Sequence, residues 1–202
     1  FQSSYTAVFK SSNLRFKVKL NVPGIYNIKN SLAALSAAFL INADMSSSIS
    51  ILESYTGVRR RFEKRGYSQG AEIIDDYAHH PTEIKATLEA ASKFNKRVIT
   101  VFQPHRYSRI KALYGKFLDC FDNTDILILT DIYSAGEQPI AGVNTKMLTD
   151  SILENGFINR IAYIPKLTDI KEYLNNIIKK DDLVLIMGAG DITRVSDELI
   201  KS

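Results

Sequence analysis

Short, continuous apolar segments recur at regular intervals after residue 70 of this 202-residue chain. Amphipathic patterns of helical length separate them, and a last one follows the final segment. Continuous apolar strands that alternate with such helices are typical of a parallel sheet covered on both faces. We therefore predict an α/β domain of about 140 residues with a doubly wound, mostly parallel sheet. The expected strands are residues 71–74, 98–102, 126–129, 161–164 and 183–187, and the expected helices are residues 84–91, 110–117, 145–153, 170–177 and 192–200.

The first sixty residues show a different pattern. Ser4–Phe9 and Arg15–Leu20 are predicted strands, and Asn30-Ser31 is predicted to open a helix after the turn residues NVPGIYN. A second helix is expected from Ser47 through Tyr55. Two strands and two helices are too few to close a core. We interpret this segment as the end of a domain whose beginning is missing.

A basic segment bounded by glycines, Gly57–Gly70, separates the two patterns and is predicted to be a linker. The expected domains are therefore residues 1–60 and 61–202. The run Arg59–Arg61 with Lys64 and Arg65 could indicate nucleic-acid binding, but no recognition motif accompanies it and the net charge is only +4. We expect no nucleic-acid partner, and interpret the segment as solvated with one arginine facing a ligand.

Composition excludes several other classes of protein. With 45% hydrophobic and 24% charged residues, the chain is typical of a globular protein, not a disordered one. Its longest apolar run, Leu32–Ile41, is shorter than the ~20 residues of a membrane span, so we expect no membrane association. The single cysteine, Cys120, excludes an internal disulfide framework and a cysteine-based zinc site, and favours a reducing cytoplasm.

Four segments directly follow predicted strands, where ligands bind in sheets of this kind. They are residues 75–83, 103–109, 130–140 and 188–192, and all three histidines fall in the first two. This clustering makes the C-terminal part of the chain the expected active site.

The first of these segments, DDYAHHPTE, has a structural interpretation and a metal-site interpretation beside its expected place in an active site. Pro81 and Glu83 suit the first turn of a helix, and Asp75, Asp76 and His80 could simply be turn and capping residues. A zinc site made of Asp76, the two neighbouring histidines and His105 is less favoured, because adjacent histidines diverge in direction. We expect no metal site.

The second segment, QPHRYSR, places two arginines and a histidine at the end of a strand. Arg106 and Arg109 would share one face if the helix had started, and paired guanidinium groups bind carboxylate or phosphate. Cations in a first helical turn oppose the helix dipole, so an anionic ligand is favoured over a merely solvated helix start.

The glycines of the chain do not form a nucleotide fingerprint. GAGDIT follows the last predicted strand, has Thr193 at the third glycine position, and is interpreted as a tight turn with Asp191 near the helix start. No GxxxxGK[ST] phosphate cradle occurs in the sequence.

Six segments together resemble the Mur ligases, ATP-dependent amide-forming enzymes of bacterial cell-wall (peptidoglycan) synthesis. Of that family, the chain is most similar to the member that joins L-alanine to the carboxylate of UDP-N-acetylmuramate. DDYAHHPTE also fits a sister ligase that attaches a recycled tripeptide, but FQPHRYSR separates the two. The segments are PGIYNIKNSLAAL (23–35), GVRRRFE (57–63), DDYAHHPTEI (75–84), FQPHRYSR (102–109), DIYSAGEQPI (131–140) and MGAGDI (187–192).

The resemblance implies that residues 61–202 are a Rossmann-like C-terminal ligase domain and residues 1–60 the end of the central ATP-binding domain. A fragment lacking the phosphate cradle is expected to be inactive alone. Tyr26 stands where the family usually has histidine before the asparagine. By resemblance, the ATP-binding residues are Asn27, Asn30, Arg61 and Asp76; the substrate-binding residues are Tyr77, His79, His105 and Arg109; and His80 and Arg106 are catalytic.

The implied reaction activates a carboxylate. ATP phosphorylates UDP-N-acetylmuramate, the amine of L-alanine attacks the acyl phosphate, and phosphate leaves. Both steps develop negative charge, which cations and Mg²⁺ would stabilise, the Mg²⁺ being held mainly by the absent part of the central domain. His80 could accept or orient an amine proton at neutral pH. A non-catalytic nucleotide- or anion-binding module is the alternative from another class.

Overall fold

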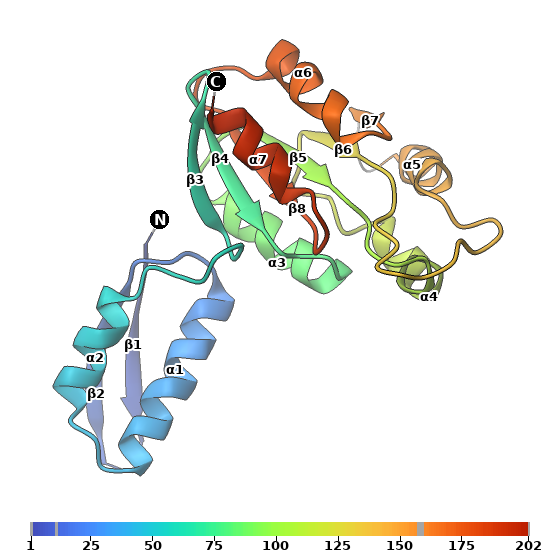
Figure 1. Cartoon of the computed structure of the whole chain (residues 1–202). Helices are drawn as coiled ribbons and strands as arrows, with labels where there is room; N and C mark the ends of the chain where they lie inside the picture. Colours follow the sequence, from blue (N-terminus) through green and yellow to red (C-terminus); the bar gives the residue numbers. More distant parts are fainter. Residues whose placement is uncertain (1, 11, 157–159, 202) are drawn as a thin grey trace. The chain divides into compact units, whose positions relative to one another are not determined.

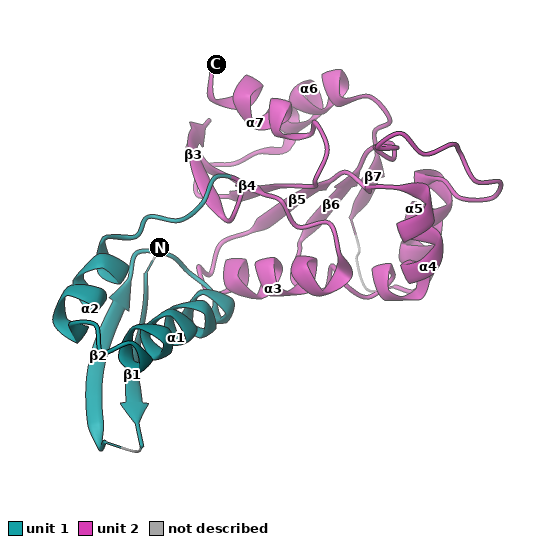
Figure 2. Ribbon diagram, turned by 60° about the horizontal axis from the view of Figure 1, so that its bottom comes forward, with its two compact units in different colours: residues 1–59 teal, residues 60–202 magenta. Residues whose placement is uncertain are grey.

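The computed structural model describes residues 2–10, 12–156 and 160–201. The chain forms two compact units, residues 1–59 and 60–202 (Figures 1 and 2). Among the described residues, no helix combines the length and the apolar character that crossing a membrane requires.

The first unit is a two-stranded antiparallel sheet with two helices. Strand β1 (Ser3–Phe9) pairs with β2 (Leu14–Leu20), and α1 (Ile25–Leu40) and α2 (Met45–Ser54) follow. Only one residue in two points inward along each strand, so the core is small. Its buried members are Ala7, Val18, Leu20, Val22 and Leu35.

Both helices of the first unit begin earlier than the sequence pattern predicts. Helix α1 starts at Ile25 because Gly24, at φ 97°, turns the chain in a conformation that suits glycine, and the Ile28 amide already donates to the Gly24 carbonyl. The prediction that Asn30 opens this helix is therefore wrong. Asp44 caps α2 by accepting a hydrogen bond from the Ser47 amide at 2.7 Å.

The second unit contains a six-stranded sheet in the order β3-β4-β8-β5-β6-β7. All neighbouring pairs are parallel except β3 and β4. This confirms the predicted α/β fold with a mostly parallel sheet, and every predicted strand is present. The strands are β3 (Glu63–Ser68), β4 (Ala71–Asp76), β5 (Val98–Phe102), β6 (Ile126–Leu129), β7 (Ile161–Tyr163) and β8 (Leu183–Met187).

Strand β3 is a correction, because it lies inside the segment predicted to be a linker. It has no apolar run and forms an edge strand, a position where charged side chains are common. Ion pairs hold it to its neighbours: Lys64 Nζ lies 2.5 Å from Glu72 of β4, and Arg65 pairs with Asp75 and Asp197. Hydrophobic periodicity cannot detect a strand held in this way.

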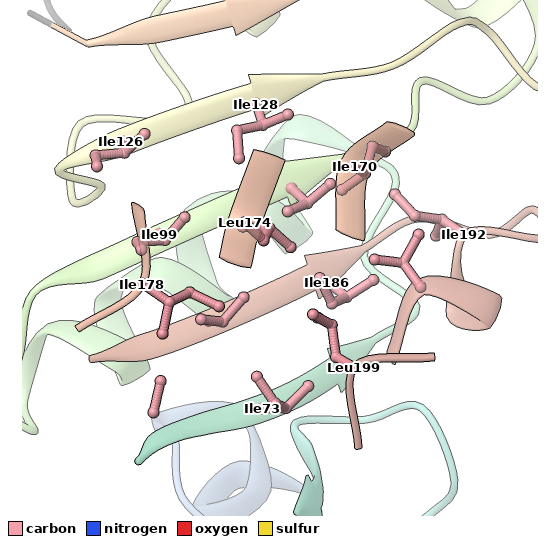
Figure 3. Packing of buried hydrophobic residues seen from close by; sticks show 14 residues of the cluster. Ile73, Ile99, Ile126, Ile128, Ile170, Leu174, Ile178, Ile186, Ile192 and Leu199 are labelled. Carbon is pink, nitrogen blue, oxygen red and sulfur yellow. The ribbon is translucent and has the colours of Figure 1, made fainter. Parts of the chain in front are cut away.

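Helices cover both faces of this sheet (Figure 2). One face carries α6 and α7, and its buried side chains form a continuous apolar cluster that includes Ile73, Ile186, Leu174 and Leu199 (Figure 3). The opposite face carries α3, α4 and α5. The bounds are α3 (Pro81–Ser92), α4 (Tyr107–Phe117), α5 (Thr145–Glu154), α6 (Leu167–Ile177) and α7 (Thr193–Ile200).

The connections diverge at the carboxyl ends of the central strands. Strand β8 leads to α7 on one face, whereas its neighbours β4 and β5 lead to α3 and α4 on the other. In sheets with this topology, ligands bind at that edge, beside loops that leave in opposite directions.

Candidate functional site

The loops at this edge are tied to one another by backbone hydrogen bonds. The Gln103 amide donates to the Met187 carbonyl at 3.0 Å, and the Gly188 amide donates to the Asp76 carbonyl at 3.1 Å. The Gln103 side chain donates to Asp191 at 3.0 Å. The ends of β4, β5 and β8 therefore form one framework that positions the side chains beyond them.

Asp75 is the most buried charged group of this framework, with no exposed surface. Its carboxylate accepts from Arg60 Nε at 3.4 Å and from Arg65 Nη1 at 3.3 Å, and the Thr193 hydroxyl also donates to it. A buried carboxylate is stable only with such partners. Asp75 thus connects the edge strand β3, strand β4 and the start of α7.

Asp76 faces the other side of the sheet and is also buried, with 3% of its surface exposed. Each carboxylate oxygen accepts a backbone amide at 2.7 Å, one from Phe62 and one from Ala78. Burial raises the pKa of Asp76 to about 6, even though these hydrogen bonds and nearby Arg61 oppose the shift. The Asp76 carboxylate therefore fixes two backbone segments: the chain just before β3, at Phe62, and the loop just after β4, at Ala78.

Tyr77 lies next to two arginines of the basic segment. The Arg60 guanidinium lies 5.0 Å and the Arg61 guanidinium 5.4 Å from the centre of its ring. Arg60 is further fixed by donating to the Gly188 carbonyl at 2.5 Å, and its own carbonyl accepts from the Tyr77 amide. Arg61 is exposed, so it is the arginine of this pair that solvent and ligands can reach.

The two adjacent histidines have different hydrogen-bond partners, and the partners fix their tautomers when they are neutral. His80 caps helix α3 and accepts the Thr82 amide at Nδ1, so its proton is on Nε2. His79 Nδ1 lies 2.9 Å from the Tyr77 carbonyl, which can only accept, so Nδ1 carries the proton. Among the described residues no side chain or backbone group hydrogen-bonds to His79 Nε2, which therefore keeps its lone pair. Pro81 and Glu83 lie in the first turn of α3, as predicted, and Glu83 also completes a capping box with His80.

His105 is held in the neutral form by its surroundings. Its Nδ1 lies 3.0 Å from Arg109 Nη1, which can only donate, so its proton is on Nε2. Burial and the neighbouring Arg109, His79 and Arg106 lower the pKa of His105 to about 4. At neutral pH His105 therefore presents an N–H donor beside the Arg109 guanidinium, an arrangement suited to a carboxylate.

Arg106 and Arg109 do not share a helical face, because the helix has not yet started at Arg106. Helix α4 begins at Tyr107, and Arg106 precedes it at φ 70°. Arg109 turns back to donate to the His105 carbonyl at 3.2 Å, whereas Arg106 Nη1 lies 3.7 Å from Glu137. The two guanidinium groups therefore have different partners.

Four aromatic rings from three loops form a continuous row across the site. The ring of Tyr77 meets that of His79 at 5.4 Å, His79 meets His105 at 5.7 Å, and His105 stacks on Tyr133 at 5.5 Å. The structure thus brings together the predicted substrate-binding residues Tyr77, His79, His105 and Arg109.

The predicted residues Asn27 and Asn30 lie in the first unit, in a pocket of about 190 Å³. Asn27 donates to the Pro23 carbonyl at 2.6 Å, and Asn30 is exposed. Each amide offers a donor and an acceptor. The other lining residues are Leu20, Val22, Ser31, Ala34, Leu52 and Tyr55, mainly apolar side chains that could pack against a flat ring.

Sequence reasoning missed Arg60, Tyr133 and Glu137 as parts of this site. Arg60 lies in a basic run beside exposed Arg59 and Arg61, and nothing in the local sequence distinguishes it from them. Tyr133 and Glu137 fall in the segment that follows a predicted strand, which is the one signal that could have found them. The described residues contain no group of three or more His, Cys, Asp or Glu side chains placed to hold a metal ion.

The fold, with arginines and a neutral His105 at the carboxyl edge of its sheet, defines an α/β domain suited to anionic substrates. The chain belongs to the Mur ligase family, because residues 60–190 match the model of the Mur ligase glutamate ligase domain.

Several curated relatives share one name, and their similarity to this chain extends over nearly its whole length. The UDP-N-acetylmuramate–L-alanine ligase of Desulforamulus reducens is 46% identical over 186 residues, covering 91% of this chain and 40% of the relative. The ligase of that name from Clostridium tetani is 47% identical over 195 residues, covering 96% and 42%. The chain thus spans about two fifths of the length of these relatives.

A solved structure shows the same arrangement of elements. The crystal structure of UDP-N-acetylmuramate–alanine ligase from Thermotoga maritima matches with a TM-score of 0.81 at 26% identity. The match covers 100% of this chain and 44% of the other. The Rossmann-like domain expected from the resemblance is therefore seen in a ligase of this family.

Proposed function

We propose that this chain is the C-terminal part of an ATP-dependent ligase that joins L-alanine to the carboxylate of UDP-N-acetylmuramate, a step of peptidoglycan synthesis in the bacterial cytoplasm. The observation that carries the proposal is the row Tyr77–His79–His105 with Arg109 at the carboxyl edge of the sheet. The names of the relatives at 46–47% identity support the particular substrates.

The two units have separate parts in this proposal. Residues 60–202 are the C-terminal ligase domain, and residues 1–59 are the end of the central ATP-binding domain. The small core of the first unit supports this division, because two strands and two helices form only part of a typical domain.

Two groups at the site suit the amino-acid substrate. The Arg109 guanidinium and the His105 N–H present donors for its carboxylate, while Arg106 adds positive charge nearby. The free lone pair on His79 Nε2 can accept a proton from the attacking amine. We therefore assign proton acceptance to His79, and treat His80 as the residue that caps α3 and orients the loop.

The residues proposed to bind ATP are found in both units. The amides of Asn27 and Asn30 fit the donor and acceptor pattern of an adenine edge, and the mainly apolar pocket around them fits its face. The exposed guanidinium of Arg61 suits a phosphate, and the Asp76 carboxylate is assigned to the ribose. Mg²⁺ would be held mainly by the ATP phosphates and by the part of the central domain that lies outside this chain.

The reaction needs groups that this chain lacks. ATP phosphorylates the muramoyl carboxylate, the amine displaces phosphate from the acyl phosphate, and the amine proton passes to His79. No GxxxxGK[ST] cradle occurs in the 202 residues. We therefore expect this chain alone neither to hydrolyse ATP nor to form UDP-N-acetylmuramoyl-alanine.

Phosphate release by a full-length ligase carrying this sequence tests the proposal. We expect release that requires ATP, UDP-N-acetylmuramate and L-alanine together, and none from the isolated chain. A preference for a tripeptide over L-alanine would favour the sister ligase. ATP binding without release from any amine would favour a non-catalytic module.

The arginine loop is tested in the same assay. Arg106→Ala and Arg109→Ala should each raise the KM for L-alanine or the muramoyl substrate, or lower kcat, by about tenfold or more. The KM for ATP should change little, because the loop follows a different strand from Asp76. Loss of ATP affinity with a normal dependence on L-alanine would contradict the assignment.

A further inference from the structure

The start of helix α4 lacks a cap from its own sequence. Arg106 occupies the capping position, and its side chain makes no capping hydrogen bond. Its backbone lies at φ 70° and ψ 130°, a region that non-glycine residues rarely adopt and that needs support from the surroundings. Since Arg106 and Arg109 lie on either side of this helix start, its support decides where both arginines lie.

Glu137, 29 residues beyond Ser108 along the chain, supplies the missing cap. One carboxylate oxygen accepts the Ser108 amide at 3.0 Å, and the other accepts the Ser108 hydroxyl at 2.5 Å. The Glu137 side chain thus satisfies an amide of the first helical turn that the helix itself cannot satisfy. It also places a negative charge at the positive end of the helix dipole.

The charge of Glu137 acts on Arg106 as well. Arg106 Nη1 lies 3.7 Å from a Glu137 oxygen, with 48% of the arginine side chain and 23% of the glutamate side chain exposed. The hydrogen bonds from Ser108, together with Arg106, lower the pKa of Glu137, so the group is ionised at neutral pH. Arg106 is therefore tethered at one nitrogen while much of its guanidinium stays accessible.

The loop that carries Glu137 is itself fixed to the residues before α4. The Arg106 amide donates to the Tyr133 carbonyl at 2.9 Å, and the Tyr133 amide donates to the Pro104 carbonyl at 2.8 Å. The Tyr133 ring stacks on His105. A Cβ on Gly190 would lie 2.6 Å from this ring, so the close approach requires glycine there. These contacts place the Glu137 side chain next to Ser108.

We propose that Glu137 is a positioning residue of the ligase site, whose carboxylate caps α4 from a separate loop and holds Arg106 and Arg109 toward the anionic substrate. This proposal rests on the proposed function for its substrate. The capping contact itself does not, so the two can be tested apart.

The capping contact is tested on this chain by NMR. The Ser108 amide should shift with pH as the Glu137 carboxyl titrates, and Glu137→Ala should remove that shift and speed exchange of the amide. Glu137→Gln keeps an acceptor oxygen and should restore much of the protection. Asp150→Asn, which removes an exposed ion pair with Lys146 in α5, is the matched control and should leave Ser108 unchanged. A Ser108 amide that behaves the same in Glu137→Ala and the parent chain would overturn the proposal.

The positioning role is tested by kinetics of the full-length ligase. Glu137→Ala should raise the KM for L-alanine about tenfold, as expected when a charge-assisted contact to the substrate is misplaced, with the KM for ATP within about twofold. Glu137→Gln should recover part of the loss, and Asp150→Asn should match the parent. An unchanged KM for L-alanine, or an equal rise in both KM values, would overturn the role. A parent ligase that does not use L-alanine would instead refute the proposed function, whatever the Ser108 amide shows.

Discussion

The two units of this chain differ in how completely they bury their apolar residues. In the second unit the central strands β5 and β8 are buried at every position. In the first unit helix α2 has no buried residue, and Leu40 and Ile41 are 80% and 78% exposed. Both units combine strands with helices, so the difference lies in whether each strand face has something to cover it.

This difference explains why the side chains of the candidate active site lie in the second unit. The side chains at the edge of the second unit are fixed by Asp75, Asp76 and Glu137, which lie on or beside a fully covered sheet. A site that must hold a carboxylate and accept a proton needs such rigid support. The pocket of the first unit instead rests on a core in which five apolar residues are buried among those that the structure describes.

The largest expected contrast is in the response to core truncation. Ile186→Ala removes a fully buried side chain of the second unit and should lower its free energy of unfolding by about 2–5 kcal/mol. Leu35→Ala should unfold the first unit while leaving the second unit's transition in place. Urea unfolding followed by residue-specific NMR in both units measures this. Ile51→Ala, at a 68% exposed position, is the control, and one shared transition in all variants would contradict the contrast.

The next contrast is the response to pH of two aspartates, one in each unit. The raised pKa of Asp76, about 6, means that the folded state binds its proton more tightly than the unfolded state. The second unit should therefore lose roughly 2–3 kcal/mol on this account as pH rises from 4 to 6, at ~1.4 kcal/mol per pKa unit. The Ser47 contacts lower the pKa of Asp44 instead, so its contribution to the first unit is present above pH 4 and is lost toward acid.

Comparison of the parent chain with Asp76→Asn isolates the first of these effects. His105 has a lowered pKa and acts in the opposite direction, stabilising the fold as pH rises from 4 to 6.5, but it is present in both proteins. The difference in unfolding free energy between the two should therefore shrink between pH 4 and 6. A constant difference would show that Asp76 is already ionised at pH 4.

Much of the fold could be predicted because buried parallel strands carry their signal in consecutive residues. Residues 98–102, 126–129 and 183–187 match the observed strands at both ends. Strand β3 could not be predicted in this way, since ion pairs to Glu72, Asp75 and Asp197 hold it. Such partners lie on other elements, and a single sequence does not reveal them.

The candidate site, like the fold, could be predicted only where the signal is local in the sequence. The histidines and arginines after β4 and β5 were predicted, because strand ends mark where ligands bind in this fold. The roles of Glu137, Tyr133 and Arg60 depend on contacts across 28 to more than a hundred residues of sequence. The backbone of Arg106, at positive φ, separates it from the helical face that its spacing suggested.

A smaller contrast separates two adjacent arginines at the start of the second unit. Arg60 pairs with buried Asp75 and donates to Gly188, so Arg60→Ala should lower the thermal unfolding midpoint, with a loss of about 2 kcal/mol. Arg61 is exposed; its guanidinium lies over the face of Tyr77, and it is near enough to Asp76 to oppose the rise in the pKa of that carboxyl. Arg61→Ala should therefore change stability by less than about 0.5 kcal/mol while reducing turnover of the full-length ligase. A large loss of stability in Arg61→Ala would instead identify it as a structural residue.

The smallest contrast is between two asparagines that line the pocket of the first unit, Asn27 and Asn30. It separates residues that stabilise this unit from residues that bind a nucleotide there. Asn27 donates to the Pro23 carbonyl at 2.6 Å, so Asn27→Ala should lower both the stability of this unit and the affinity for ATP. Asn30 is exposed in α1, and none of the side-chain hydrogen bonds found in the described residues involves it. Asn30→Ala should therefore leave the unit's unfolding unchanged and even favour the helix slightly, since alanine has the higher helix propensity. In the full-length ligase, the same change should weaken ATP binding about fivefold, the effect of one lost hydrogen bond. Calorimetric titration with ATP, beside a thermal melt of each variant, separates the two effects. Unaltered ATP affinity in Asn30→Ala would remove this residue from the nucleotide site and leave only the pocket's shape in favour of adenine.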